Sequence, residues 1–244
     1  MELKRLLSLT RKAVDDYSQI EEGDKIAVGI SGGKDSLTLL YALAGLRRFY
    51  PKRFDLCAIT VDLGFPGFDT QKINSLCEEL SVPYTVVKTD IYDIVFNIRK
   101  ESNPCSLCSK LRKGSLNSAI VDMGCNKVAY GHHMNDVVDT LMLSLIYEGR
   151  INTFSPVTYL DRMKVTVIRP LLYVKESDII GFRNKMDLPV IKGICPADGY
   201  TKREYVKELL DRINSENPGV RERMFTAIEG SSIKGWNNEQ HELP

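Results

Sequence analysis

A glycine-rich junction between a predicted strand and a predicted helix constrains the fold of this chain more than any other stretch. Residues 25–30 have the pattern of a buried strand, and a helical pattern begins at Ser36. The adjacent Gly32 and Gly33 let the backbone turn tightly without Cβ interference, so consecutive N–H groups can point into one concavity at a helix N-terminus. Such a concavity binds phosphate. The junction therefore predicts a nucleotide site, with an ordinary glycine-rich turn as the simpler alternative.

The junction is not a Walker A loop. Only three residues separate Gly29 from Gly33. Asp35 follows Lys34 at the position where a Walker A loop has the Ser or Thr that holds magnesium. If the loop binds a nucleotide, it does so as a different class of phosphate loop.

Strand and helix patterns alternate along the chain, which is typical of an α/β fold with a doubly wound, mainly parallel sheet. Strand patterns cover residues 25–30, 54–61, 83–89, 127–130 and 165–168. Helical patterns cover residues 1–20, the stretch from 36 towards Pro51, and residues 70–80, 137–147, 175–186, 201–214 and 218–229. We expect an N-terminal helix on the sheet edge (1–20), a main domain (21–190), a C-terminal helical extension packed on it (191–230) and a flexible tail (231–244).

The sequence contains no membrane or export signal that we recognise. No apolar stretch approaches the length of a membrane-spanning helix, and residues 1–20 lack the apolar core of a signal peptide. We therefore expect a cytoplasmic protein with no membrane partner. In that compartment cysteines are more often thiols or metal ligands than disulfides. The six cysteines are Cys57, Cys77, Cys105, Cys108, Cys125 and Cys195.

Three of these cysteines are candidates for a metal site. Cys105 and Cys108 follow Pro104 at the start of a helix, where their spacing lets both thiols face one ion or cluster. Cys195 lies in a loop of similar character. Three thiolates would hold a [4Fe–4S] cluster and leave one iron open to an exogenous ligand such as sulfide. A redox pair or a helix cap is the alternative.

The remaining cysteines have other surroundings. Cys57 belongs to a strand core and Cys77 to the apolar stripe of a helix, so we expect both to be packing residues. Cys125 lies in a turn before the fourth strand pattern, and whether it is a ligand stays open.

A second strand-to-helix junction runs from Gly131 to Asp136. It should lie on the same sheet edge as the first junction, because the carboxyl ends of parallel strands meet there. Its side chains offer imidazole, amide and carboxylate groups, and Asp136 could help to hold the magnesium that bridges a carboxylate to a substrate phosphate. Helix capping and packing are the simpler roles for its two histidines.

Positive charge gathers in two segments although the formal net charge is only +1. Between residues 97 and 115, five cations oppose Glu101 alone, which gives +4, and they are Arg99, Lys100, Lys110, Arg112 and Lys113. Between residues 162 and 234, fourteen Lys and Arg oppose ten Asp and Glu, which again gives +4. These segments could bind a polyanion, or they could be ordinary solvated helix faces.

Together these motifs resemble the TtcA branch of the PP-loop ATP pyrophosphatases, the tRNA 2-thiocytidine synthetases. The resemblance covers about residues 20 to 230. It is carried by the SGGxDS loop from Ser31 to Ser36, by Pro104-Cys105-x-x-Cys108, by Gly131-His132-His133, by Ile168-Arg169-Pro170-Leu171, and by the ending with Lys202-Arg203-Glu204, Pro218, Met224 and Phe225. Asn135 stands where the branch has the first Asp of a GHHxDD segment. The chain lacks the flanking zinc-finger cysteines of the related 2-thiouridine enzymes.

This resemblance implies an adenine nucleotide alpha hydrolase-like fold and an enzyme that cleaves ATP to AMP and pyrophosphate. The C2 oxygen of an anticodon-loop cytidine would attack the α phosphorus, and sulfur would then displace the adenylated oxygen. ATP, Mg²⁺ and a [4Fe–4S] cluster would be the cofactors. The partners would be tRNA and a sulfur donor, either a cysteine desulfurase or free sulfide, and a homodimer is an open alternative.

The resemblance also implies roles for individual residues. The catalytic residues would be Lys34, Asp35 and Asp136. The nucleotide would be bound by Ser31, Gly32, Gly33, Lys34, Asp35 and Ser36, by Thr60, Val61 and Asp62 around the adenosine, and by Gly131 and His132. The cluster would be ligated by Cys105, Cys108 and Cys195, and magnesium by Asp136. RNA would be bound by Arg99, Lys100, Lys110, Arg112, Lys113, Lys202 and Arg203.

Two other functional classes stay open. A PP-loop enzyme that adenylates a small molecule for sulfur or nitrogen transfer would keep Lys34 but would need no polyanion surface. A non-catalytic iron–sulfur protein would bind ATP without releasing pyrophosphate.

Overall fold

The centre of the molecule is a six-stranded sheet in the order β3-β2-β1-β4-β6-β5. It is seen in a computed structural model that describes residues 1–99, 104–191 and 202–237. Neighbouring strands are parallel except β5 and β6, which pair antiparallel at one edge. The strands are β1 (Asp24–Gly29), β2 (Phe54–Asp62), β3 (Tyr84–Lys88), β4 (Lys127–Ala129), β5 (Val157–Leu160) and β6 (Val165–Ile168). The predicted α/β class with a mainly parallel sheet is confirmed.

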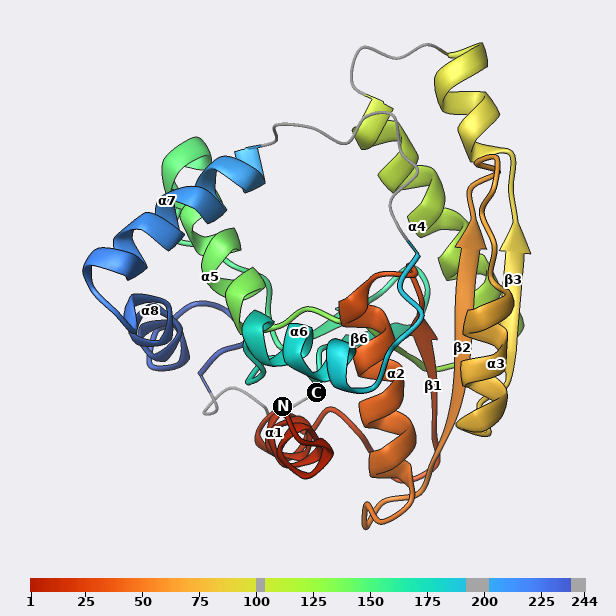
Figure 1. Cartoon of the computed structure of the whole chain (residues 1–244), viewed down its shortest axis with the longest axis horizontal. Coiled ribbons are helices and arrows are strands. Elements are labelled where there is room, and N and C mark those ends of the chain that lie inside the picture. The colour runs from red at the N-terminus through yellow and green to blue at the C-terminus, as the bar shows by residue number, and fades with distance from the viewer. Residues whose placement is uncertain (100–103, 192–201, 238–244) are drawn as a thin grey trace.

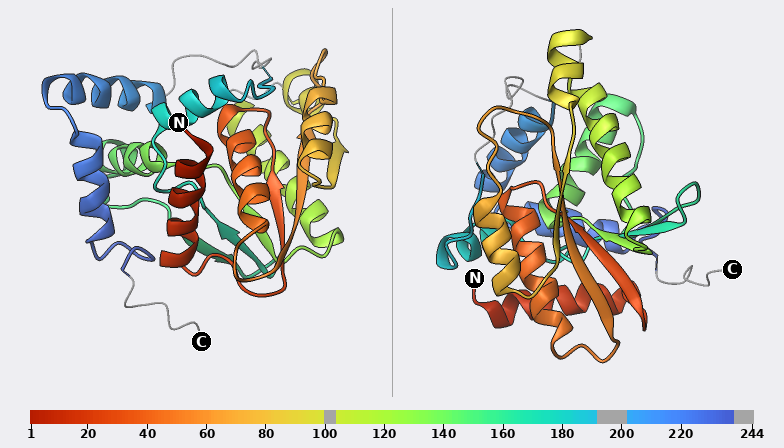
Figure 2. Two further views of the ribbon diagram at one scale, coloured as in Figure 1. Left: turned by 60° about the horizontal axis from the view of Figure 1, so that its bottom comes forward. Right: turned by 90° about the vertical axis from the view of Figure 1, so that its right-hand side faces the viewer.

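Helices cover both faces of this sheet. The helices are α1 (Leu3–Asp16), α2 (Lys34–Arg47), α3 (Gln71–Glu79), α4 (Pro104–Asp122), α5 (Met134–Leu143), α6 (Glu176–Lys185), α7 (Lys202–Glu216) and α8 (Val220–Glu229), with π-helical segments η1 (Asp93–Ile98) and η2 (Ser144–Glu148). Helices α2 and α3 lie on one face and α4 lies on the other, as the right view of Figure 2 shows. Helices α5, α7 and α8 form a separate group at one side of the molecule (Figure 1).

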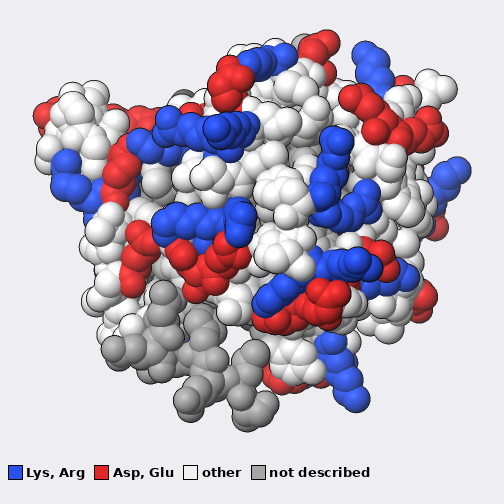
Figure 3. Space-filling view, turned by 90° about the horizontal axis from the view of Figure 1, so that it is seen from below, with Lys and Arg blue, Asp and Glu red and all other residues white. Residues whose placement is uncertain are grey.

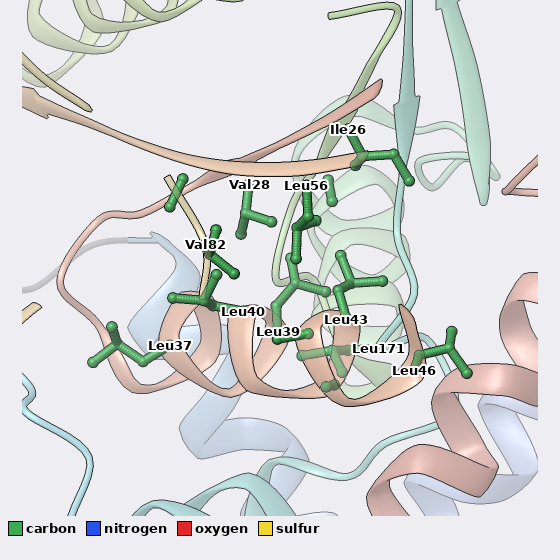
Figure 4. Close-up of a cluster of buried hydrophobic side chains, with 14 of the residues drawn as sticks. Ile26, Val28, Leu37, Leu39, Leu40, Leu43, Leu46, Leu56, Val82 and Leu171 are labelled. Atoms are coloured by element: carbon green, nitrogen blue, oxygen red, sulfur yellow. The ribbon is translucent and has the colours of Figure 1, made fainter. Parts of the chain in front are cut away.

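Helix α2 is the most deeply buried helix of the first face. It packs against β1 and β2 on one side and against α1 and α6 on the other. Its leucines accordingly point in all directions rather than along one stripe, and Leu37, Leu39, Leu40, Leu43 and Leu46 are all fully buried (Figure 4). The core therefore fixes the position of the helix whose N-terminus follows the glycine-rich loop.

The opposite face is covered by α4. Leu116 and Ile120 of this helix join a core formed by the residues of β1 and β2 that point to this side. Cys57 and Cys125 lie in the same core with their Sγ atoms 3.5 Å apart, and Cys77 is buried under the other face. The predicted packing role of Cys57 and Cys77 is confirmed.

Three segments differ from the sequence prediction. Helix α1 packs against α2 and not on a sheet edge, as the left view of Figure 2 shows. Strand β5 was not predicted, because a four-residue edge strand with partly exposed side chains has no clear apolar alternation. Residues 231–237 are held against the body, because Trp236 is buried and its indole N–H donates to the carbonyl of Phe154 at 3.0 Å. The rest of the predicted tail lies outside the described residues.

The order of the strands places a ligand site between β1 and β4. After β1 the chain continues to β2 and β3 at one edge of the sheet, and after β4 it continues to β5 and β6 at the other edge. The direction in which strands are added therefore reverses between β1 and β4. Open α/β sheets bind ligands at this point, beyond the carboxyl ends of the strands. Among the described residues, no helix has the length and apolar character needed to cross a membrane.

Candidate active site at the glycine-rich loop

The glycine-rich loop is braced by its own serines. Gly32 has φ +81°, a left-handed conformation that favours glycine, and Gly33 is the N-cap of α2. The Gly33 N–H donates to Ser31 Oγ at 3.3 Å, and Ser36 Oγ donates to the Gly33 carbonyl at 3.0 Å. The Ser31 N–H in turn donates to Ser36 Oγ at 3.2 Å. The concavity is therefore shaped by the protein alone, with the N-terminal end of α2 facing it.

Gly131 brings the second junction into contact with the first. A Cβ atom at Gly131 would lie 2.8 Å from the carbonyl carbon of Asp35 and 3.0 Å from the backbone nitrogen of Ser36. Real Cβ contacts are not that short, so this close approach requires glycine. The expected meeting of the two junctions on one sheet edge is confirmed.

Lys34 is held at the rim of the concavity by two carboxylates. Its Nζ lies 3.2 Å from Asp35 Oδ1 and 3.1 Å from Glu176 Oε1. Burial alone would lower the pKa of Lys34, but the charges of Asp35 and Glu176 outweigh it and raise the pKa. Lys34 is therefore a permanent cation beside the phosphate-binding loop.

Glu176, the first residue of α6, is the second carboxylate. Its Oε1 also lies 3.1 Å from Lys207 Nζ on α7, and its backbone N–H donates to Asn135 Oδ1 at 3.0 Å. Burial would raise the pKa of Glu176, but Lys207 and Lys34 together lower it to about 2. Glu176 is thus ionised at any pH at which the protein works.

His133 lies between Asp35 and Asp136. Its Nε2 is 3.6 Å from Asp35 Oδ1 and 3.4 Å from Asp136 Oδ2. Asp136 also accepts the backbone N–H of His133 at 3.0 Å, which caps α5, and its other oxygen accepts from Arg203 of α7 at 2.9 Å. A second chain of polar groups, with His133 between two carboxylates, therefore links the start of α2 to Arg203 of α7.

His132 points to a different set of partners. Arg169 Nε donates to His132 Nδ1 at 3.2 Å, and the imidazole lies 4.8 Å from the ring of Phe154. Burial and the neighbouring Arg169 cation lower the pKa of His132 to about 4. His132 is therefore neutral, and because its Nδ1 accepts a hydrogen bond, its proton resides on Nε2.

At the end of β2, Val61 points into the core under α4, whereas Thr60 and Asp62 point to the sheet face that α2 covers. Thr60 is buried and accepts a hydrogen bond from Tyr84 Oη at 2.8 Å, and Asp62 Oδ1 accepts the N–H of Gly64 at 2.9 Å. Val61 packs into the core beside α4, so a contact of Val61 with a nucleotide would come from its backbone.

Asp35 and Asp136 could hold a cation that a substrate phosphate also ligates, but they do not by themselves form a complete metal site. Asp35 Oδ1 is a buried atom that accepts no hydrogen bond from the described residues, although Lys34 lies near it. No group of three or more His, Cys, Asp or Glu residues in the described part of the chain is arranged to hold a metal ion. Magnesium needs only one or two carboxylates when a substrate phosphate supplies further ligands.

The candidate cluster cysteines are only partly described. Cys105 is exposed on the first turn of α4, and Cys108 is half-buried one helical turn later. Cys195 lies outside the described residues, but Ile191, four positions before it, donates its backbone N–H to the Gly32 carbonyl at 2.9 Å. Cys125 follows the far end of α4, and the helix from Cys108 to its last residue, Asp122, is about 21 Å long at 1.5 Å per residue. Cys125 therefore cannot share one cluster with Cys105 and Cys108.

The described candidate RNA-binding residues lie on α4 and α7, except Arg99, which directly follows η1. Both helices begin on the side of the molecule to which the parallel strands point (Figure 1). The described cations there are all exposed: Arg99, Lys110, Arg112, Lys113, Lys202 and Arg203. Lys202 Nζ also lies 4.6 Å from the centroid of the Tyr147 ring. Lys100 lies outside the described residues. On the opposite side of the molecule, Lys and Arg are interspersed with Asp and Glu (Figure 3).

Comparison with known proteins decides the family. The model of the PP-loop domain matches residues 5–210. The tRNA-cytidine(32) 2-sulfurtransferase of Geobacter sulfurreducens is 40% identical over 228 residues, which are 92% of this chain and 89% of that protein. The enzyme of the same name from Geobacter metallireducens is 42% identical over 220 residues, 89% of this chain and 86% of that protein. This chain belongs to the tRNA-cytidine(32) 2-sulfurtransferase branch of the PP-loop family.

Solved structures agree with this assignment. The U34-tRNA thiolase NcsA from Methanococcus maripaludis, solved with its [4Fe-4S] cluster, matches with a TM-score of 0.71 and 26% identity, over 90% of this chain and 76% of that chain. The NH3-dependent NAD synthetase from Campylobacter jejuni matches with a TM-score of 0.50 and 15% identity, over 100% of this chain and 98% of that chain. The second likeness concerns the PP-loop fold alone.

Four residues of the PP-loop site were not predicted as site residues: Glu176, Lys207, His133 and Arg169. Glu176 contacts Lys34, and Lys207 contacts Glu176, from helices about 140 to 170 positions further along the chain, so no local pattern could identify them. Arg169 and His133 stood within motifs that carried the family resemblance, and this was the only sequence signal for them.

Proposed function

We propose that this protein is an ATP-dependent tRNA sulfurtransferase that adenylates the C2 oxygen of an anticodon-loop cytidine and replaces that oxygen with sulfur. The observation that carries the proposal is the braced PP-loop with Lys34 at its rim, in a chain whose relatives at about 40% identity are tRNA-cytidine(32) 2-sulfurtransferases. The loop supplies phosphate binding, and the relatives supply the class of substrate.

The first step that we propose is attack of the cytidine C2 oxygen on the α phosphorus of ATP. The bond between the α phosphorus and the bridging oxygen to the β phosphorus breaks, and pyrophosphate leaves with the electron pair. The backbone N–H groups of the PP-loop and Lys34 stabilise the charge that develops on the leaving group, because they are oriented before the reaction begins. Thr60, Val61, Asp62, Gly131 and His132 are the proposed contacts on the remaining part of the nucleotide.

In the second step, a sulfur nucleophile attacks C2, the C–O bond breaks, and AMP carries the original oxygen away. An amide-like oxygen is a poor leaving group, whereas AMP is a good one, so the first step makes the second possible. Cys105, Cys108 and Cys195 would hold a [4Fe–4S] cluster, which supplies an iron that can bind sulfide when the cluster is present. The exposed thiol of Cys105 and the position of Cys108 one turn later fit this role.

Magnesium is the other ion in this proposal. Asp35 and Asp136 would hold it together with the phosphates, and the buried Asp35 Oδ1 without a hydrogen bond from the described residues supports Asp35 as a ligand. The ion would neutralise charge on the phosphates.

The tRNA would be bound by the exposed cations of α4 and α7, together with Arg99 and Lys100. A base in a single-stranded loop can be turned out of the stack and inserted into a site, as this chemistry requires. We further propose a sulfur donor, either a cysteine desulfurase or free sulfide, a second copy of the chain in a homodimer, and a cytoplasmic location. We also propose the division into an N-terminal helix (1–20), a PP-loop domain (21–190), a helical extension (191–230) and a C-terminal segment (231–244) whose first seven residues pack on the body.

Analysis of the nucleotide products tests this proposal. The purified protein is reconstituted anaerobically with iron and sulfide and is then incubated with ATP, Mg²⁺ and tRNA. The products are identified by phosphorus NMR. We expect AMP and pyrophosphate in amounts that depend on tRNA. Release of ADP and phosphate would overturn the reaction class, and equal AMP release without tRNA would favour the alternative of a small-molecule substrate.

A further inference from the structure

We propose that Glu176 is a positioning residue of the ATP site, which holds Lys34 Nζ at the rim of the PP-loop through an ion-pair chain that ends on Lys207. The inference deepens the proposed function and rests on it. Glu176 would act on the pyrophosphate leaving group through Lys34 and would not touch the nucleotide itself.

The contacts of Lys34 show why a second carboxylate matters. Asp35 is its neighbour in the sequence and lies on the first turn of α2, so this pair alone draws the ammonium group back towards its own helix. Glu176 contacts the same Nζ from α6, at 3.1 Å. The side chain of Glu176 is only 16% exposed, so this contact is shielded from water. Lys34 is therefore held from two different elements.

Glu176 is itself fixed at both its backbone and its carboxylate. Asn135, on the first turn of α5, accepts the backbone N–H of Glu176 at 3.0 Å and so satisfies one of the unpaired donors at the start of α6. Lys207 lies 3.1 Å from the same carboxylate oxygen that contacts Lys34. The carboxylate is therefore anchored independently of Lys34, which a positioning residue needs to be.

In this arrangement one set of groups binds ATP and another stabilises the departing pyrophosphate. The backbone N–H groups of the loop remain available for the phosphates whether or not Glu176 is charged. Without Glu176, the Lys34 ammonium keeps its charge but loses the contact that keeps it extended over the loop. A small displacement of a group that stabilises the transition state can cost about 100-fold in rate. The loss should therefore appear in kcat and not in the affinity for ATP.

The test compares Glu176→Gln with Glu222→Gln. Glu222 forms an ion pair with Lys175, the residue directly before Glu176, but contacts nothing in the PP-loop, so it is a matched loss of a carboxylate. We expect Glu176→Gln to lower kcat for tRNA-dependent pyrophosphate release by about 10- to 100-fold and to change the Kd of α,β-methylene-ATP by less than about threefold. Glu222→Gln should leave both constants unchanged.

Variants of Lys207 test the ion-pair chain that runs from Lys34 through Glu176 to Lys207. Lys207→Ala should lower kcat in the same direction, Lys207→Arg should restore it, and Lys207→Ala combined with Glu176→Gln should be no worse than Glu176→Gln alone, because the residues act as one unit. An unchanged kcat in Glu176→Gln, an equal loss in Glu222→Gln, or a loss confined to ATP affinity would each overturn the inference.

A readout without turnover keeps the inference separate from the proposed function. Acetylation of Lys34 by a soluble N-hydroxysuccinimide ester, followed by peptide mass spectrometry, reports how firmly its ammonium group is held. We expect faster acetylation of Lys34 in Glu176→Gln and not in Glu222→Gln. If the wild type releases no pyrophosphate but this difference in acetylation is present, the proposed function is wrong and the contact between Glu176 and Lys34 is still supported. If the rates are equal, the inference fails even in an active enzyme.

Discussion

Lys34 is the single residue whose charge the proposed chemistry uses most directly. Lys34→Ala should cost about 2 to 4 kcal/mol of transition-state stabilisation, comparable to the loss of one oriented donor to a developing oxyanion. The measurement is kcat/KM for pyrophosphate release. Lys52→Ala, which removes a lysine from an exposed ion pair with Glu21 far from the site, is the control and should be neutral. Equal activity of Lys34→Ala and wild type would exclude Lys34 from the reaction.

Gly131 supports a second prediction at this scale. In Gly131→Ala the new Cβ would meet the backbone of Asp35 at 2.8 Å, so the two junctions must separate, and both the unfolding temperature and ATP affinity should fall. Gly114→Ala is the matched control, because nothing lies within 4 Å of a Cβ there and the helical position should gain about 0.5 to 1 kcal/mol in the free energy of unfolding. Equal unfolding temperatures for the two variants would contradict the close approach.

Sequence patterns predicted local site residues and missed distant ones. The segment from Ser31 to Ser36 was predicted because its glycines, serines and lysine act within one turn. Glu176 on α6, the partner of Lys34, and Lys207 on α7, which contacts Glu176, were not predicted, because an ion pair between residues 34 and 176 leaves no trace in local periodicity. Asn135 is similar: its departure from the family pattern was visible, but its role as an acceptor for the α6 N-terminus depends on how two helices meet.

At the scale of elements, the contact between α2, α6 and α7 should depend on pH. The pKa of Glu176 is lowered to about 2 from an ordinary value of 4.5, so its ion pairs stabilise the fold fully above pH 4.5 and lose this effect as pH falls towards 2. This lowering of the pKa corresponds to at most about 3.4 kcal/mol in the free energy of unfolding. Urea unfolding of wild type and Glu176→Gln should therefore differ at pH 7 and converge near pH 2. A difference that is constant with pH would contradict the pairing.

Helix α4 separates the cysteines into two groups. Cys105 and Cys108 lie at its start, and Cys125 follows its end beside Cys57. After anaerobic reconstitution, Cys105→Ala, Cys108→Ala and Cys195→Ala should each lose iron and the EPR signal, whereas Cys57→Ser, Cys77→Ser and Cys125→Ser should retain both. Loss of iron in Cys125→Ser, or zinc in place of iron in anaerobically purified protein, would contradict this ligand set.

The predicted elements were correct where a buried face gave a clear period. Strands β1, β2 and β6 and helices α3, α6 and α8 lie within a few residues of their predicted bounds. Strand β5 and segment η1 were missed because both are short and partly exposed. The sequence pattern predicted one buried stripe on α2, but the helix is buried all round. The packing of α1 and α6 on its outer side is a tertiary property that the local pattern does not show.

At the scale of the whole molecule, the fold brings the three proposed sites to one side. The PP-loop, the start of α4 with Cys105 and Cys108, and the start of α7 with Lys202 and Arg203 all lie beyond the carboxyl ends of the parallel strands (Figure 1). A reaction that joins ATP, sulfur and a polyanion needs such an arrangement. The near-zero net charge is no obstacle, because local charge and not the total determines where a polyanion binds.

The central claim is that this protein replaces an oxygen of a tRNA cytidine with sulfur at the expense of ATP. The most direct measurement is mass spectrometry of nucleosides from the tRNA of a strain that lacks the gene, complemented with either wild type or Lys34→Ala. We expect one thiolated cytidine to disappear on deletion, to return with wild type and to stay absent with Lys34→Ala. Retention of every thiolated nucleoside in the deletion strain would contradict the claim.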